Sequence, residues 1–411
     1  MTTNVIIGSG FAGLKAAETI RSLDASATVI ILTEEGDLPY WRPRLPDYIA
    51  RQVTIDKLAI RTAAWLTEKR IDVRLNQRVA AIYPSQNRVL LVDGSAVPYD
   101  NLLLATGSLA RRPGRDIPGS DLLGVVTLRT LEDARHIANL LDQADRTAVV
   151  GGGLLGIELV RAFRERGNAV TYFMREDRFW PQMLDVTAAS MVEGRLVARG
   201  IELRHGELIK EIKGQDGRVS SITTTKGEGL PCQVVGYAIG AVPATAVLAE
   251  SGIKVDKGVL VDETLRTNIP NIYAAGDVAQ ALDLVHGDYR VNTSVANAQT
   301  QGEVAGSNMA GVARSFRGAV ASNAMQIYGI SFACSGIAIP PGPGFEEITG
   351  MYPRGDVYKK LVLKDAKLVG AMLLGDIAEN KAVQELIAQG RDLSNVRDRL
   401  LTDGFDLRQL V

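Results

Sequence analysis

Two stretches of the sequence share one pattern, and this pattern limits the possible folds more than any other feature. NVIIGSGFAGLKAAETIRSL begins at Asn4, and TAVVGGGLLGIELVRAFRERG begins at Thr147. Each combines a short apolar strand, the motif G-x-G-x-x-G and an amphipathic helix. The first glycine permits a tight turn, the second lets the backbone approach a pyrophosphate, and the third lets helix and strand pack closely. The helix N-terminus then directs amide donors at the phosphates. The sequence therefore predicts two dinucleotide-binding sites.

The residues of both turns are candidate cofactor ligands. They are Gly8, Gly10, Phe11, Ala12 and Gly13 in the first turn, and Gly151, Gly153, Leu154, Leu155 and Gly156 in the second. The predicted fold class is accordingly α/β, with two Rossmann-like dinucleotide-binding domains.

The strand that follows each turn distinguishes the two sites. TVIILTEE (Thr28–Glu35) aligns with AVTYFMRE (Ala169–Glu176), which places Glu34 opposite Arg175. An acidic group at this position accepts hydrogen bonds from an unphosphorylated ribose, as in FAD or NAD, and repels a 2′-phosphate. Arg175 can instead pair with a 2′-phosphate, with the arginine three residues later as a helper. The two acidic residues between these arginines leave a solvated charged turn as the alternative, so NADPH and NADH both stay open.

Two further apolar strands end in small turns that fit a nucleotide. YDNLLLATGS ends in the turn Ala105–Gly107, and TNIPNIYAAGDVAQ ends in Gly276 and Asp277. An aspartate at such a strand end can accept hydrogen bonds from a ribityl chain. The order of these turns around the glycine motifs assigns FAD to the first site and NAD(P)H to the second.

These motifs resemble the FAD-dependent pyridine nucleotide-disulfide oxidoreductase superfamily. ATG at Ala105–Gly107, GGGLLGIE at Gly151–Glu158 and YAAGD at Tyr273–Asp277 follow its order. PYWRPRL, AIGAVPA and QGEVAGSNMAG are more specifically similar to NADH:rubredoxin reductases and to the flavin module of assimilatory nitrite reductases. The resemblance implies a glutathione-reductase-like fold with an FAD domain over residues 1–117 and 240–318, an NAD(P)H domain over 118–239, and a small α+β C-terminal interface domain over 319–411.

The resemblance also implies roles for single residues. Relatives that read RPPLSK have a lysine beside the flavin where this chain has Asp47, so Arg42 or Arg44 would have to supply a cation there. Glu158 would lie near the junction of flavin and nicotinamide, and the backbone near Val79 along the adenine. The candidate catalytic residues are therefore Glu158, Arg42 and Arg44, and the implied FAD contacts are Gly8, Gly10, Gly13, Glu34, Arg42, Thr106, Gly107 and Asp277.

A helix is predicted over Asn292–Gly311, and its start near Val295 could direct amides and its dipole at the flavin. An ordinary packing helix is compatible with the same residues. The mechanism class is hydride delivery from nicotinamide to flavin, with the protein positioning the rings and stabilising the negative charge that develops.

The cysteines limit where the electrons go next. Disulfide reduction needs a thiol beside the flavin, and no cysteine falls between Met1 and Pro231. Cys232 and Cys334 are expected to be buried apolar thiols. A thiol relay is therefore excluded, and the electrons must leave the flavin directly to a docked redox protein, a small oxidant or a quinone.

We favour a rubredoxin- or ferredoxin-like iron–sulfur carrier as the acceptor. LARRPGR places Arg111, Arg112 and Arg115 just beyond a predicted flavin-side turn, and Arg42, Arg44 and Arg51 could extend this positive rim. A diaphorase or quinone reductase with a small-molecule acceptor is a second interpretation. A flavin-binding redox-sensing or interaction protein is a third.

Composition excludes other classes of function. Lys and Arg total 46 against 47 for Asp and Glu, so nucleic acid is not an expected partner. The three histidines and two cysteines show no metal-ligand spacing, and no apolar run is long enough to span a membrane. MTT leads directly into a strand, so we expect a cytoplasmic protein. The expected oligomeric state is a monomer or a homodimer.

The last hundred residues follow a different pattern. AMQIYGISFACSGI and KKLVLKDAKLVGAMLLGD are predicted as strands, the second with a turn at KDAK. AENKAVQELIAQG is predicted as an amphipathic helix that ends at Gly390, and the loop Ile339–Glu347 lies between these elements.

Overall fold

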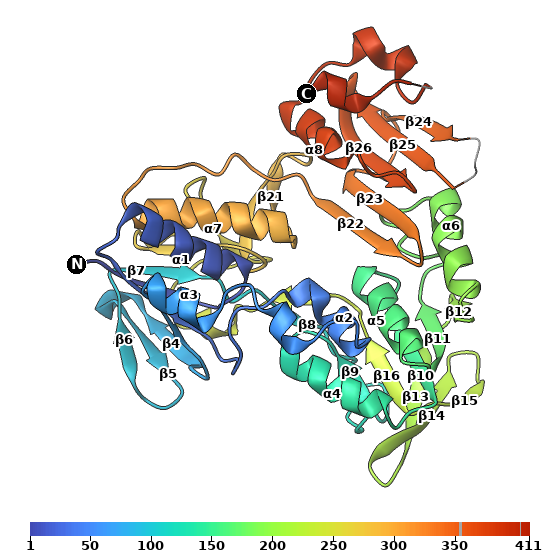
Figure 1. Cartoon of the computed structure of the whole chain (residues 1–411), viewed down its shortest axis with the longest axis horizontal. Coiled ribbons are helices and arrows are strands. Elements are labelled where there is room, and N and C mark those ends of the chain that lie inside the picture. The colour runs from blue at the N-terminus through green and yellow to red at the C-terminus, as the bar shows by residue number, and fades with distance from the viewer. Residues whose placement is uncertain (353–355, 403) are drawn as a thin grey trace. The chain divides into compact units, whose positions relative to one another are not determined.

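The computed structural model describes residues 1–352, 356–402 and 404–411 (Figure 1). Its contacts divide the chain into two compact units, each assembled from three segments. The first unit comprises residues 1–43, 54–109 and 241–319, and the second comprises residues 44–53, 110–240 and 320–411. Each unit contains a parallel sheet with helices, which confirms the predicted α/β class.

A parallel sheet with the strand order β19-β7-β1-β2-β3 forms the centre of the first unit. Its strands are β1 (Thr3–Ile7), β2 (Thr28–Leu32), β3 (Ile71–Arg74), β7 (Asn101–Leu104) and β19 (Ile272–Ala274). The order reverses at β1, which has β2 on one side and β7 on the other. Dinucleotides bind at this reversal point of open α/β sheets, outside the carboxyl ends of the strands.

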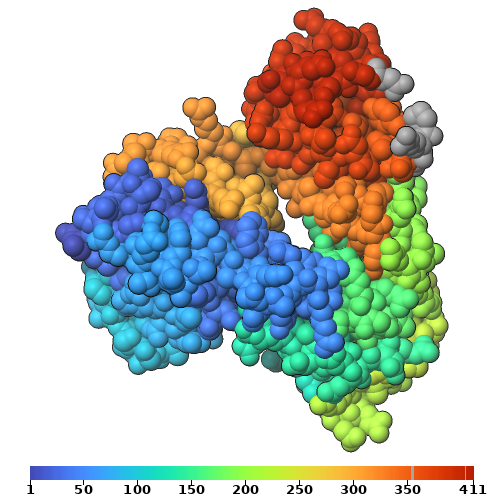
Figure 2. All heavy atoms as spheres, viewed as in Figure 1, coloured from blue at the N-terminus to red at the C-terminus, as the bar shows by residue number. Residues whose placement is uncertain are grey.

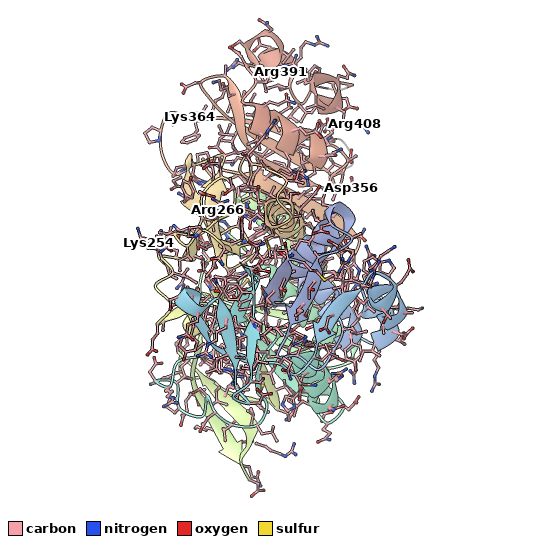
Figure 3. All side chains as sticks on the ribbon, turned by 90° about the vertical axis from the view of Figure 1, so that its left-hand side faces the viewer. Lys254, Arg266, Asp356, Lys364, Arg391 and Arg408 are labelled. Atoms are coloured by element: carbon pink, nitrogen blue, oxygen red, sulfur yellow. The ribbon has the colours of Figure 1, made fainter. Side chains whose placement is uncertain are left out.

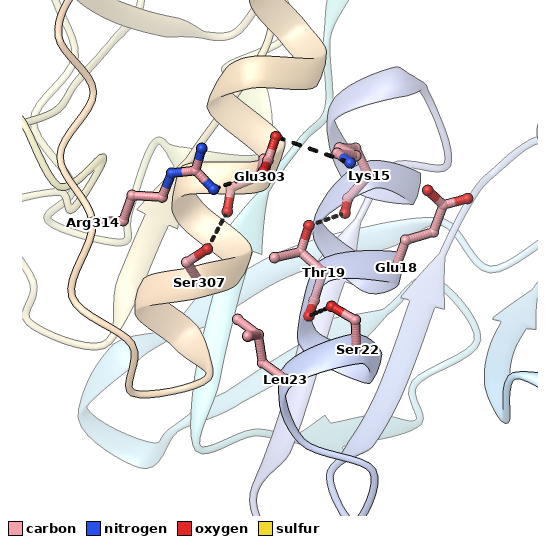
Figure 4. A pocket seen from close by; sticks show the side chains of 8 residues that line it. All are labelled: Lys15, Glu18, Thr19, Ser22, Leu23, Glu303, Ser307 and Arg314. Atoms are coloured by element: carbon pink, nitrogen blue, oxygen red, sulfur yellow. Dashed lines mark hydrogen bonds and ion pairs between the residues drawn. The ribbon is translucent and has the colours of Figure 1, made fainter.

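Helices α1 (Phe11–Leu23) and α7 (Val295–Met309) lie side by side in the first unit (Figures 1 and 2). Glycines allow this close approach, because a Cβ on Gly302 would lie 2.3 Å from the backbone oxygen of Ala12. At the rim of the helix pair, Glu303 binds Arg314 at 2.6 Å and Lys15 at 3.9 Å (Figure 4). Through Glu303, this exposed bridge links α7 to Lys15 of α1 and to Arg314, which follows α7.

Shorter elements complete the first unit. Helix α3 (Ala63–Glu68) begins at the side-chain cap Thr62 and packs against β3. The remaining strands are β4 (Val79–Tyr83), β5 (Arg88–Leu91), β6 (Ala96–Pro98), β8 (Ser108–Ala110), β17 (Ala241–Pro243), β18 (Val259–Leu260), β20 (Ala279–Asp283) and β21 (Asp288–Arg290). β4–β6 form an antiparallel sheet whose buried residues join the same apolar core as the parallel sheet.

The second unit repeats the arrangement of the first. Its parallel sheet has the order β12-β11-β10-β16-β9, and the strand order reverses at β10. The strands are β9 (Val125–Thr127), β10 (Arg146–Val150), β11 (Ala169–Met174), β12 (Glu202–His205) and β16 (Val234–Tyr237), and the helices are α2 (Leu45–Ile49), α4 (Leu131–Leu141), α5 (Leu154–Glu165) and α6 (Val186–Val197). An antiparallel sheet of β13 (Ile209–Gln215), β14 (Arg218–Thr224) and β15 (Gly229–Pro231) shares its core.

The C-terminal part of the second unit contains an antiparallel sheet with the order β22-β23-β26-β25-β24 and the helix α8. Its elements are β22 (Ser322–Ile327), β23 (Ile330–Gly336), β24 (Glu346–Met351), β25 (Tyr358–Lys364), β26 (Lys367–Leu374) and α8 (Asn380–Gln389). Both predicted strand stretches are hairpins, and Gly390 ends α8 with a left-handed φ of 57°. β24 was not predicted, because its residues are alternately exposed and follow a Pro/Gly loop.

Figure 3 labels charged side chains that belong to both units, among them Arg266 and Arg391. In the first unit Arg266 stacks over the ring of Tyr273, and in the second Arg391 donates to the carbonyl oxygen of Leu410. Among the described residues, none of the helices is long and apolar enough to cross a membrane.

Two helical glycines allow a matched stability test of the α1–α7 contact. We expect Gly302→Ala to destabilise the protein by about 1–3 kcal/mol, because the new methyl group meets the backbone of Ala12. Gly194→Ala in α6 meets nothing within 4 Å and should stabilise the protein by about 0.5–1 kcal/mol. Denaturant unfolding followed by circular dichroism measures both, and equal effects of the two variants would contradict the close-packing argument.

Candidate functional site

The first glycine turn joins β1 to α1 and makes close backbone contacts. The Gly8 amide donates to the Leu32 carbonyl at 2.8 Å, and Gly8 has a φ of +110°. A Cβ on Gly8 would lie 2.1 Å from the Ala105 oxygen, and one on Gly13 would lie 2.0 Å from the Gly8 oxygen. Side chains are therefore excluded at both positions, and the turn is held against the strand end at Ala105.

The middle glycine faces open space. Gly10 is the N-cap of α1, forms no side-chain cap and would meet nothing within 4 Å if it carried a Cβ. The amides of the first helical turn therefore remain available to an anionic ligand. This open turn fits a pyrophosphate group, as the sequence pattern predicts.

The other small turns gather around this one. A Cβ on Gly276 would lie 3.1 Å from the Cβ of Ala12, and the Gly276 amide donates to Gln301 Oε1 at 2.7 Å. Ser108 Oγ donates to Asp277 Oδ2 at 2.9 Å, and Thr106 Oγ1 donates to the Ala244 carbonyl at 2.9 Å. The structure thus brings the predicted turn at Ala105–Gly107 and the predicted pair Gly276–Asp277 together beside α1.

Helix α7 begins at Val295, the predicted position, after Ser294, whose Oγ accepts from the Asn297 amide at 3.3 Å. Two buried polar atoms near this end, Asn292 Nδ2 and Asn297 Oδ1, have no hydrogen-bond partner among the described residues. Buried polar atoms are normally paired. An unpaired donor and acceptor at this helix start fit a ligand with a polar edge, such as a flavin ring, and the sequence pattern gave no sign of them.

Arg42 is held by a partner that the sequence did not indicate. Its Nη2 binds Glu35 Oε1 at 2.7 Å, and its Nη1 donates to the Tyr40 hydroxyl at 2.8 Å. Burial lowers the pKa of Arg42, but the charges of Glu35 and Asp277 and the nearby Tyr40 outweigh it and keep the pKa above its usual value. Arg42 is therefore a fixed cation within electrostatic reach of Asp277.

Two predicted contacts on the adenine side, Glu34 and Val79, take no part in that ion pair. Glu34 is exposed after β2 and lies 3.6 Å from Arg78. Val79 is half-buried at the start of β4, beside Leu91. Phe11, the first residue of α1, packs edge-on against Trp41 with ring centroids 5.1 Å apart.

The second glycine turn repeats the geometry of the first. Gly151 has a φ of +126° and its amide donates to the Phe173 carbonyl at 3.0 Å. A Cβ on Gly156 would lie 1.9 Å from the Gly151 oxygen, and the Tyr172 hydroxyl donates to the same oxygen at 2.8 Å. Gly153 is the N-cap of α5 and faces open space, so the amides of the first turn of α5, which begins with Leu154 and Leu155, can also receive an anion.

The registers of the two sheets confirm that Glu34 and Arg175 occupy equivalent positions. The carbonyl of Leu32 accepts the Gly8 amide, and the carbonyl of Phe173 accepts the Gly151 amide. Glu34 lies two residues after Leu32, and Arg175 lies two residues after Phe173. The Arg175 side chain is 76% exposed and lies 2.8 Å from Glu176. The helper Arg178 binds Asp177 at 2.9 Å and is less exposed.

Glu158 on α5 lies in a cluster of charges that the sequence did not predict. Arg161 donates through Nη2 to Glu158 Oε2 at 2.6 Å and to Asp47 Oδ1 at 2.7 Å, and it binds Glu165 at 3.2 Å. Burial is the main cause that raises the pKa of Glu158, and the charge of Arg161 opposes it. The cation beside Asp47 in this unit is therefore Arg161, together with Arg44, which binds Asp47 at 3.2 Å.

The predicted positive rim is only partly available, which corrects the sequence interpretation. Arg42, Arg44 and Arg51 are each engaged by an acid: Glu35, Asp47 and Asp142, respectively. Arg111, Arg112 and Arg115 are exposed and form no ion pair within the described part of the chain.

Both cysteines are buried, as expected. Burial raises the pKa of Cys232 to about 12 and raises that of Cys334 as well. The described residues contain no group of His, Cys, Asp and Glu able to hold a metal ion. His205 and His286 instead contact Glu193 and Asp283 at 2.9 and 2.8 Å.

Residues 2–302 match the family model described as pyridine nucleotide-disulphide oxidoreductase. The chain belongs to this family. Residues 322–391 match the model of the rubredoxin NAD+ reductase C-terminal domain. Members of this family use FAD and NAD(P)H, and the two open glycine turns fit these two cofactors.

Individual relatives agree with this membership. The chain is 31% identical to the rubredoxin-NAD(+) reductase of Pseudomonas putida, over 75% of this chain and 80% of that one. It is 29% identical to the nitrite reductase [NAD(P)H] of Bacillus subtilis, over 95% of this chain but only 48% of the relative. The crystal structure of a ferredoxin reductase from Rhodopseudomonas palustris has the same fold, with a TM-score of 0.91, 24% identity and complete coverage of both chains.

Burial of the thiols allows a direct test of whether electrons pass through a cysteine. We expect Cys232 and Cys334 to resist an aromatic disulfide reagent at mildly alkaline pH, because a buried thiol whose pKa is about 12 stays protonated. Both thiols should react after unfolding. A double variant with both cysteines replaced by alanine should keep the wild-type rate of electron transfer from NAD(P)H through the flavin to an iron–sulfur carrier, and loss of that transfer would contradict a thiol-free path.

Proposed function

We propose that this protein takes a hydride from NADPH, holds the electrons on FAD and passes them to a small iron–sulfur carrier. The observation that carries the proposal is the pair of open glycine turns, one in each unit, in a chain whose thiols are buried. The first turn holds FAD and the second holds the nicotinamide cofactor. Relatives named rubredoxin reductases support a carrier as acceptor.

Bound FAD supplies the redox chemistry, since a flavin accepts a hydride and releases electrons one at a time. The chain supplies position and charge. The first-turn amides of α1 and α5 hold the two pyrophosphates, and the N-terminus of α7 with Asn292 and Asn297 binds the polar edge of the flavin ring. Arg42, fixed by Glu35, stabilises negative charge near Asp277, and Glu158 contacts the nicotinamide end of the second cofactor.

The remaining assignments follow from the same scheme. Glu34 binds the ribose of FAD, and the backbone near Val79 lies along its adenine. We place the protein in the cytoplasm, where NADPH is regenerated, as a monomer or homodimer. Both cofactor sites then work without a membrane or a nucleic acid partner.

The choice of nicotinamide cofactor depends on Arg175. We expect NADPH to reduce the flavin faster than NADH, and Arg175→Ala to weaken NADPH binding about tenfold or more while leaving NADH binding nearly unchanged, because a charge-assisted hydrogen bond to a phosphate contributes roughly 1.5–3 kcal/mol. Anaerobic mixing, followed by the loss of oxidised-flavin absorbance, measures both cofactors.

Glu176→Gln is the matched control for this test. It removes the acid that pairs with Arg175 at 2.8 Å, so it should strengthen NADPH binding. Faster reduction by NADH in the wild type, unchanged by Arg175→Ala, would show that Arg175 is only part of a solvated turn.

The carrier site is tested by charge reversal. We expect the double variant Arg111→Glu/Arg112→Glu to raise the apparent KM for an acidic rubredoxin or ferredoxin at least about tenfold at low salt, with a smaller effect at high salt, because screening weakens exposed charges. Reduction of a neutral quinone should not change. Arg195→Glu/Lys210→Glu, at two other exposed cations of the same unit, is the control with an equal change in net charge, and an equal effect of both double variants would rule out a specific docking loop.

A further inference from the structure

Arg161 on α5 is a nearly buried cation that binds several side chains of the second unit. It is 10% exposed and donates to carboxylates at three positions, Asp47, Glu158 and Glu165. Its Nη1 also donates to Gln52 Oε1 at 3.1 Å, and Gln52 Nε2 donates to Glu165 Oε2 at 2.6 Å. One guanidinium therefore ties α5 to α2 and to the segment that follows α2.

The charges in this cluster do not balance. Three carboxylates surround Arg161, and among the described residues the one further cation that binds any of them is Arg44, at Asp47. The pKa of Arg161 is raised above its usual value, because these carboxylates outweigh the cost of burial. A partly buried site with excess negative charge disfavours ionisation of its least compensated acid.

Glu158 is the acid in this cluster whose ionisation is disfavoured, because burial raises its pKa and the negative charges of Asp47 and Glu165 add to that effect. Both contacts from Arg161, by Nε at 3.0 Å and by Nη2 at 2.6 Å, reach the same oxygen, Oε2. Oε1 has no hydrogen-bond partner among the described residues, and the side chain is 23% exposed. By contrast, Asp47 has both oxygens engaged, one by Arg161 and the other by Arg44. Glu158 thus combines a fixed oxygen with a free one, one turn into the helix that follows the second glycine motif.

We propose that Arg161 is a positioning residue for the nicotinamide cofactor, which clamps Glu158 by Oε2 so that Oε1 is presented to the bound ligand. The inference rests on the proposed function, since it concerns the site of the second dinucleotide. Arg161 also compensates the charge of Asp47 and Glu165, whose carboxylates would otherwise drive Glu158 to its neutral form. The neighbouring Tyr328 does not take part in the titration, because burial raises its pKa to about 12.

Each surrounding charge shifts the pKa of Glu158 in a known direction. Burial, Asp47 and Glu165 raise its pKa, and Arg161 lowers it. Removal of Arg161 should therefore move the ionisation of Glu158 to higher pH. Replacement of Glu165 by glutamine should move it to lower pH, because a negative neighbour is lost while the other contacts of Arg161 remain.

The test measures the dissociation constant of NADP+ for the oxidised holoenzyme across pH, with the infrared band of a protonated carboxyl as a second readout. We expect Arg161→Gln to weaken binding about tenfold or more and to move the carboxyl titration to higher pH. Arg161→Lys keeps the charge but loses the two-pronged contact, so it should restore the titration and only part of the affinity. Glu165→Gln should shift the titration to lower pH, and Glu158→Gln should abolish the band.

Arg166→Gln is the structural control. Arg166, the C-cap residue of α5, is 4% exposed and also ties the end of this helix to α2, through the Ile49 carbonyl at 2.9 Å, but its acidic partner is Asp142. It should lower the unfolding temperature as Arg161→Gln does and leave the NADP+ affinity and the carboxyl band unchanged.

If Arg161→Gln and Arg166→Gln behave alike, Arg161 only packs α5 against α2 and the inference is wrong, while the proposed function stands. If Glu158→Gln changes neither binding nor the infrared band, the inference is wrong as well. A wild-type flavin that neither NADPH nor NADH reduces would overturn the proposed function and the inference together.

Discussion

The structure depends on the contact between the third glycine of each motif and the backbone of the first. A Cβ at Gly13 or Gly156 would lie within 2.0 Å of a carbonyl oxygen, so each helix can rest on its turn only without a side chain there. This contact directs the N-termini of α1 and α5 at the carboxyl edges of their sheets. The middle glycines, Gly10 and Gly153, then face open space where a phosphate fits. Both cofactor sites follow from this one steric constraint.

The two units share this scaffold and differ in the charges attached to it. After β2 the first unit carries Glu34 and then Glu35, which fixes Arg42. After β11 the second unit carries Arg175 at the place of Glu34, and Arg161 on α5 binds the surrounding carboxylates. The backbone geometry of the two glycine turns is therefore shared, while the charges at the strand ends and on the following helix differ between the two units.

Sequence reasoning worked where the signal is local. The glycine motifs predicted the strand–turn–helix units, the helix predicted within Asn292–Gly311 starts near Val295 as expected, and Gly390 marked the end of α8. Contacts between segments that are distant in the sequence could not be predicted in this way. Asp47 and Arg161 are 114 residues apart, and nothing in either segment identifies the other as its partner. Similarly, Asn292 and Asn297 are ordinary polar residues in sequence, and their unpaired atoms become visible once the fold buries them.

Contacts between distant segments also decide which arginines remain free to attract an electron acceptor. An arginine attracts an acidic carrier only if its charge is not already neutralised by an acid of its own chain. Arg42, Arg44 and Arg51 each have such an acid at 2.7–3.2 Å, so they contribute little to an external field. Arg111, Arg112 and Arg115 have none among the described residues. Ion pairing within the fold thus reduces the predicted rim of six arginines to the three in one short loop, Arg111, Arg112 and Arg115.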